Sequence, residues 1–164
     1  MPMGLTSNAV TPLHAVRTTV AAVLCYLIAR LVRLPEPYWA PISTLIVMQS
    51  TLGASLPISM QRLAGTAIGC AAGALAAARF PGSVWAFGAA ILLVGLLSAA
   101  TKLDRISYRY AGITIAIVML VTRAAEGWLI ALHRFLEVSL GIGVGLLVTA
   151  VWPEKLPDHA ERVP

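Results

Sequence analysis

The residues with the clearest capacity for chemistry are Arg134 and Glu137, which stand inside a long apolar segment. They are three residues apart, so on a helix they share a face with Gly141 and Gly145. An arginine at the centre of a bilayer costs about 2.5–3.5 kcal/mol on insertion scales, so its side chain needs protein, water or a partner around it. Two interpretations follow. The pair either holds helices together, or forms an anion site in which Arg134 binds a substrate carboxylate and Glu137 tunes it or carries a proton.

Arg62 is a second basic residue within an apolar segment, and it allows the same two interpretations. It has no acidic neighbour in sequence and lies close to a predicted connection, so its guanidinium could instead extend to the lipid head groups. The side chain of Arg17 could extend to the lipid head groups in the same way. His133 is a candidate proton relay, although it lies on a different helical face from Arg134. The sequence leaves the roles of His14, Arg17 and His133 open.

Aromatic and polar residues supply further candidates for a substrate pathway. The pair Tyr38 and Trp39 suits either the head-group belt of a membrane helix or a wall on which an aromatic ring stacks. Gln49 and Thr114, like Ser43, could line a polar path or hydrogen-bond between helices. The predicted pathway candidates are therefore Arg134, Glu137 and Arg62, together with Tyr38, Trp39, Gln49 and Thr114.

Sequence patterns for catalysis or cofactor binding are missing. There is no glycine-rich phosphate loop, no metal-ligand spacing and no nucleophile elbow. Cys25 and Cys70 both lie in apolar runs, which predicts small core residues rather than a disulfide or a metal site. We therefore predict that the protein is not an enzyme, with no catalytic residue, no cofactor and no metal.

The composition indicates an integral membrane protein. Of the 164 residues, 59% are hydrophobic and only 12% are charged, whereas about a quarter of the residues in soluble domains are charged. The apolar residues form blocks rather than alternating strands, which favours helices over a β-barrel. In such a protein the net charge of +5 is explained by loop residues that face lipid head groups, so we predict the lipid bilayer as a partner and no nucleic acid.

Proline, glycine and polar residues divide the chain into six predicted helices. These are expected at about residues 13–34, 39–54, 57–80, 83–100, 108–121 and 128–152. The first helix has no cleavage site after it and is expected to be retained. The domain organisation is then an N-terminal tail (1–12), a six-helix membrane domain (13–153) and a C-terminal tail (154–164).

Two halves of the membrane domain, 13–81 and 84–153, resemble each other in sequence. The matched pairs are Trp39 with Tyr110, Ser43 with Thr114, Arg62 with Arg134, Gly69 with Gly141, and Gly73 with Gly145. Each half holds three helices, and because three is odd, the second half must be inverted in the membrane relative to the first. The fold class predicted is therefore all-α and polytopic, with two inverted three-helix repeats and a site at their interface.

Glycines spaced four residues apart predict close helix packing, because they lie on one face and let another helix approach. They are Gly65, Gly69 and Gly73 in the first half, with Gly141 and Gly145 in the second.

Basic residues favour a location of both termini in the cytoplasm. With that orientation the cytoplasmic ends carry Arg17, Arg62, Lys102, Arg105, Arg109, Lys155 and Arg162, and the outer ends carry Arg30, Arg33, Arg79, Arg123 and Arg134.

Four blocks of sequence resemble the fusaric acid resistance-like family, the aromatic acid exporter group of bacterial inner-membrane proteins. They are Tyr38-Trp39-Ala40-Pro41 with the following Ile-Val-Met-Gln, Gln61 to Gly69, Tyr108 to Thr114, and Arg134-Phe135-Leu136-Glu137 followed by Gly141. The blocks occur in the family's order, and the resemblance covers about residues 13–153.

The resemblance implies a six-helix domain in the inner membrane that exports aromatic carboxylates or similar organic anions, driven by the proton gradient. The family commonly carries a sizeable cytoplasmic domain after the membrane domain, which this sequence does not include. We therefore expect a homodimer or a partner subunit to complete the pore. The alternatives are a small dimeric anion channel, as in the similar modules of plant malate channels, or a membrane subunit that does not transport.

Overall fold

The computed structural model describes residues 11–49, 51–121 and 127–153, and every regular element in those ranges is a helix. This confirms the all-helical prediction. The elements are α1 (Pro12–Leu31), α2 (Trp39–Val47), α3 (Leu52–Arg79), α4 (Val84–Ala100), α5 (Arg105–Ala116), which continues into the π-helix η1 (Ile117–Val121), and α6 (Gly127–Val151). Most of the two predicted tails, and Arg123, Lys155 and Arg162 among the residues used for orientation, lie outside the described ranges.

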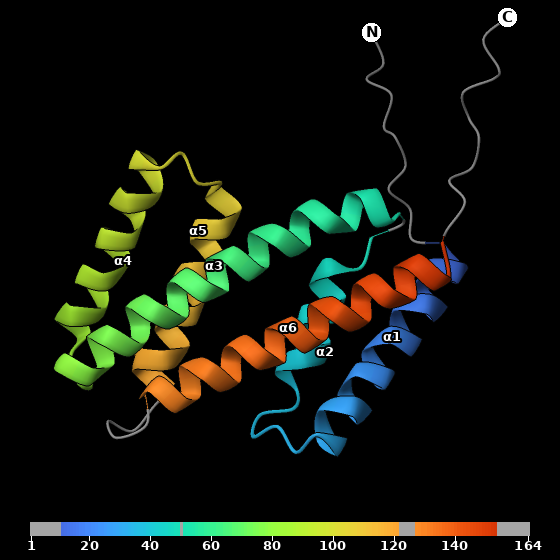
Figure 1. Ribbon diagram of the computed structural model, residues 1–164, viewed down its shortest axis with the longest axis horizontal. Coiled ribbons are helices and arrows are strands. Elements are labelled where there is room, and N and C mark those ends of the chain that lie inside the picture. The colour runs from blue at the N-terminus through green and yellow to red at the C-terminus, as the bar shows by residue number, and fades with distance from the viewer. Residues whose placement is uncertain (1–10, 50, 122–126, 154–164) are drawn as a thin grey trace, which may run out of the picture.

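Two long helices, α3 and α6, cross the molecule and pack against each other (Figure 1). The short helix α2 packs on α6 and α1, and the short helix α5 packs on α3 and α4. Outermost on opposite sides are α1 and α4, and successive helices alternate in direction (Figure 1). The start of α1 and the end of α6 therefore lie at the same end of the molecule, which we call the terminal end; the α1–α2 connection lies at the opposite end (Figure 1).

Helix length and exposure separate the outer from the inner helices. Among the described residues, α1 and α6 are long and apolar enough to cross a membrane. Helix α4 is shorter, but it presents large apolar side chains outward, among them Trp85 and Leu93. Helix α2 has 9 residues, or about 14 Å at 1.5 Å per residue, about half the thickness of a bilayer core. The short helices α2 and α5 each pack between two longer helices.

Glycines on α3 form the contact surface for α5. A Cβ atom added at Gly69 would lie 2.7 Å from Cβ of Thr114, and one added at Gly65 would collide with the carbonyl oxygen of Ser107. Gly73 meets η1 in the same way, with a Cβ position 3.1 Å from Cβ of Val118. The three glycines predicted to allow close packing thus lie where α5 and η1 pass over α3.

The contact between α6 and α2 is built in the same manner. A Cβ atom at Gly141 would collide with the carbonyl oxygen of Ala40 and lie 2.6 Å from Cβ of Ser43. Gly145 is less tight, since its Cβ position would be 3.6 Å from the carbonyl oxygen of Thr44. Thr44 also donates a hydrogen bond of 2.9 Å to the carbonyl oxygen of Gly141, which joins the two helices directly.

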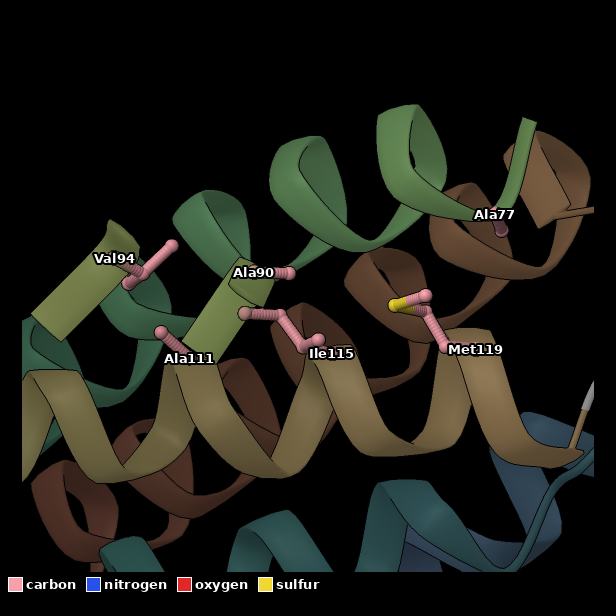
Figure 2. Packing of buried hydrophobic residues seen from close by; sticks show 6 residues of the cluster. All are labelled: Ala77, Ala90, Val94, Ala111, Ile115 and Met119. Atoms are coloured by element: carbon pink, nitrogen blue, oxygen red, sulfur yellow. The ribbon is translucent and has the colours of Figure 1, made fainter. Parts of the chain in front are cut away.

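Small side chains also let α4 approach α5. Figure 2 shows Ala90 and Val94 of α4 beside Ala111 and Ile115 of α5, all buried in one cluster with Ala77 and Met119. Cys25 and Cys70 are buried and unbridged, so the prediction of small core residues is confirmed.

The predicted boundary between the second and third helices is wrong. Helix α2 ends at Val47, not at Ala54, and α3 begins at Leu52 with Pro57 inside it. The reason is a side-chain cap: Thr51 accepts a hydrogen bond of 3.3 Å from the backbone N–H of Ala54, which starts the helix before the proline. Helix α5 likewise begins at Arg105, three residues before the predicted start.

Candidate anion-binding site

Buried charges in the described residues are three arginines and one glutamate. Arg17 is on α1, Arg62 on α3, and Arg134 and Glu137 on α6; their exposed fractions are 0%, 6%, 3% and 0%. Isolated buried charges are costly unless they are paired or hydrogen-bonded. The excess of buried positive charge is the electrostatic feature that distinguishes the interior of this protein.

Arg134 lies flat on an aromatic side chain. Its guanidinium carbon is 3.8 Å from the ring centroid of Trp39, at the start of α2. Nη1 of Arg134 is 3.5 Å from Oε2 of Glu137, one turn along the same helix. Nevertheless, Nε and Nη1 of Arg134 have no hydrogen-bond acceptor among the described residues. The guanidinium is therefore held in position by the ring and by the charge of Glu137, while its Nε has no partner among the described residues.

Glu137 and Trp39 are both fixed by the α1–α2 connection. One oxygen of Glu137 accepts a hydrogen bond of 3.2 Å from the backbone N–H of Glu36. The indole N–H of Trp39 donates to the carboxylate of Glu36 at 2.8 Å. Glu36 thereby joins the pair on α6 to the start of α2, a role that the sequence pattern does not predict.

A cavity of about 390 Å³ lies against this pair at the end opposite the terminal end. Its lining includes Glu36, Leu129, His133, Arg134 and Glu137. The cavity brings His133 to the same site as Arg134, although the two differ in burial. The lining combines apolar side chains, Leu129 and Ile130, with charged ones, and the volume is in the range that holds a small organic ligand.

Arg62 has a different environment. Its Nη2 donates a hydrogen bond of 3.0 Å to the hydroxyl of Ser43 on α2, and its guanidinium carbon is 4.8 Å from the ring centroid of Tyr110 on α5. Within the described ranges no carboxylate lies within ion-pair distance of it, and its Nε has no hydrogen-bond acceptor. Its side chain is buried rather than extended to the head groups, so that expectation is wrong.

The other predicted pathway residues do not gather at the cavity. Tyr38 is 49% exposed and contacts Trp39 with a ring-centroid distance of 5.5 Å. Thr114 is buried and donates to the carbonyl oxygen of Tyr110 within its own helix, at 2.9 Å. Gln49 follows α2 at the terminal end, and its backbone oxygen accepts a hydrogen bond from Arg17.

Arg17 joins three helices at the terminal end. Its Nη2 donates to the carbonyl oxygen of Gln49 at 2.6 Å, and its Nη1 donates to that of Trp152 at 2.9 Å. These carbonyls follow the C-terminal ends of α2 and α6, where a helix leaves acceptors unsatisfied and favours positive charge. Arg17 is therefore a structural link, and its snorkelling to the head groups is excluded by its complete burial.

Replacing Arg17 by methionine is expected to lower the free energy of unfolding by about 1–3 kcal/mol, because the carbonyls of Gln49 and Trp152 lose their donor. Arg30 on the same helix is exposed, so Arg30→Met is the matched control and should change stability little. Both can be measured by unfolding in mixed micelles. Equal effects from the two substitutions would show that Arg17 does not hold the helix ends together.

Comparison with known proteins gives the same family along almost the whole chain. The sequence model described as the fusaric acid resistance protein family matches residues 11–162. The uncharacterized transporter YdhK of Escherichia coli (strain K12) is 32% identical over 151 residues, which cover 87% of this chain and 22% of YdhK. Inner membrane protein YeeA of the same organism is 30% identical over 156 residues, which cover 89% of this chain and 42% of YeeA. The chain thus spans less than half the length of these relatives. No solved structure matches it.

Proposed function

Because the chain belongs to the fusaric acid resistance protein family, we propose that it is the membrane domain of a transporter that exports aromatic carboxylates or related organic anions, coupled to protons. The relatives' names support transport and the inner membrane, since one is a transporter and another an inner membrane protein. The domain is residues 13–153. A small organic anion is the substrate, and a homodimer or a partner subunit completes the pathway.

The membrane architecture proposed is six spans arranged as two inverted repeats, residues 13–81 and 84–153. The contacts support it, because α2 packs on α6 as α5 packs on α3, and α1 packs on α2 as α4 packs on α5. The glycine contacts follow the same rule: Gly141 meets Ser43, and Gly69 meets the matched Thr114. The two ends of the described chain lie together (Figure 1), as an even number of spans requires, and the charge bias favours the cytoplasm for both.

The observation that carries the proposed substrate class is the stacked Arg134 beside a cavity. A carboxylate can accept a hydrogen bond from the unpartnered Nε and compete with Glu137 for Nη1, since guanidinium groups bind oxygen anions strongly. An aromatic ring attached to that carboxylate has apolar lining nearby, at Leu129 and Ile130. Arg134 and Glu137, with Arg62, Tyr38, Trp39, Gln49 and Thr114, remain the candidates for the pathway.

Glu137 is the group that couples the site to protons. It is fully buried and its charge is balanced by Arg134, at 3.5 Å. A substrate carboxylate that binds Arg134 competes with Glu137 for the same guanidinium, so the charge of one affects the binding of the other. Proton movement and anion movement are therefore linked at one place.

Flux of labelled benzoate through proteoliposomes tests the proposal. Saturable release that depends on an imposed pH gradient is expected for the wild-type protein. Release that ignores the pH gradient and follows only the electrochemical gradient of the anion would contradict proton coupling and indicate a channel. Folded protein that releases neither benzoate nor larger aromatic carboxylates, alone or as a dimer, would contradict export and indicate a subunit that does not transport.

A further inference from the structure

Arg62 and Arg134 occupy matched positions in the two halves of the chain, and each contacts an aromatic residue of the other half. Arg62 belongs to the first half and stacks on Tyr110 of the second, whereas Arg134 belongs to the second half and stacks on Trp39 of the first. Tyr110 and Trp39 are themselves a matched pair. Each arginine therefore bridges the two halves, and the same construction occurs twice within one chain.

The two positions lie toward opposite ends of the molecule. Helix α3 starts at the terminal end, and Arg62 is in its first half. Helix α6 starts at the other end, and Arg134 is in its first half, beside the cavity. An anion that crosses the domain would thus meet one arginine from each side.

The surroundings differ in charge. Oε2 of Glu137 lies 3.5 Å from Nη1 of Arg134. The position that matches Glu137 in the first half is Gly65, which has no side chain and packs against the carbonyl oxygen of Ser107. Glu36, which also lies at the Arg134 site, is three residues before Trp39, and the position three residues before the matched Tyr110 is the uncharged Ser107. Within the described ranges Arg62 therefore has no carboxylate beside it; it donates a hydrogen bond to the hydroxyl of Ser43 and lies over the ring of Tyr110.

Competition with a carboxylate weakens anion binding at an arginine, and a buried arginine without one binds an anion more tightly. We infer that Arg62, with Ser43 and Tyr110, is a loading half-site that takes an organic carboxylate from the terminal end. Arg134, with Trp39 and Glu137, is the releasing half-site at the opposite end. This inference rests on the proposed transport function, and it predicts unequal half-saturation concentrations of the anion on the two sides of the membrane.

Half-saturation for benzoate, measured separately from the two sides of the membrane, tests this assignment. A protease-cleavable tag on the C-terminus identifies the side to which the terminal end faces in each proteoliposome preparation. The wild-type protein should half-saturate at a lower benzoate concentration from the terminal side. Arg62→Gln should raise that concentration at least about 10-fold, the effect of losing a hydrogen bond to a charged group, and change the value from the opposite side less than about 3-fold.

Two matched variants separate charge from structure. Arg62→Lys keeps the charge and should stay closer to wild type than Arg62→Gln. Ser43→Ala keeps the Cβ atom that contacts Gly141 and removes only the hydroxyl that accepts from Arg62. It should therefore raise the half-saturating benzoate concentration on the terminal side less than Arg62→Gln does. If Arg62→Gln does not fold, Ser43→Ala tests the half-site in its place.

Equal shifts from both sides, or no shift in folded Arg62→Gln, would overturn the inference. The proposed function would survive that result if the folded double variant Arg134→Gln/Glu137→Gln still showed no flux. Unchanged flux in both arginine variants would instead overturn the proposed site, so the two failures can be told apart.

Discussion

Replacing Arg134 by glutamine is expected to abolish benzoate transport and to lower the free energy of unfolding by about 3–5 kcal/mol, because it leaves Glu137 buried without its partner. A loss of function alone would therefore not distinguish an anion site from a structural ion pair. The measurement is unfolding in mixed micelles together with benzoate flux in proteoliposomes.

The double substitution Arg134→Gln/Glu137→Gln removes both charges and makes the distinction. We expect it to recover most of the stability but none of the transport. Glu137→Gln alone should also be destabilised, since the arginine then lacks its carboxylate, and added benzoate should raise its unfolding temperature more than that of the wild type. Recovery of transport in the double variant would show that the pair is only structural.

Gly141→Ala is expected to destabilise the domain by about 1–3 kcal/mol through overpacking. The new Cβ atom would collide with the carbonyl oxygen of Ala40 and force α2 away from α6. Because Trp39 precedes Ala40 on α2, the same displacement should disturb the stack on Arg134 and reduce benzoate binding. Unfolding in mixed micelles and a benzoate titration measure the two effects.

Gly143→Ala is the matched control for that substitution. Among the described residues, no heavy atom apart from the adjoining residues and backbone of the same helix lies within 4 Å of the Cβ position at Gly143, so alanine there should only improve helix propensity, by about 1 kcal/mol at most. Gly145→Ala should be intermediate, because its nearest neighbour would be at ordinary contact distance. Similar stability in the Gly141 and Gly143 variants would contradict close packing of α2 on α6.

The sequence was sufficient to predict the helices, the close glycine contacts and the pair on α6. Periodicity and composition are local signals, and Arg134 and Glu137 are one turn apart, so their proximity follows from helix geometry. The residues that contact the buried arginines cannot be predicted from helix geometry, because they come from other helices. Tyr110 and Ser43 meet Arg62 only because three helices converge there. The best available signal was the repeat, which matches Trp39 with Tyr110 and Arg62 with Arg134.

Helix ends were predicted less well than helix faces. Pro57 suggested a helix start, but the side chain of Thr51 caps the helix earlier, and a proline is tolerated near the start of α3. Glu36 lies between Pro35 and Pro37, and this local pattern indicates only a turn. Its role depends on the backbone of that turn meeting Glu137, a contact between residues far apart in the chain. Long-range contacts of this kind leave no periodic pattern.

Equilibrium binding of benzoate to the purified protein in detergent tests the central claim most directly. The wild type and the Arg134→Gln/Glu137→Gln variant are titrated side by side, since both are expected to be folded. We predict that the wild type binds benzoate saturably at both half-sites, and that the variant loses the binding at Arg134 and keeps the binding at Arg62. Equal binding by the two proteins would contradict an anion site at Arg134.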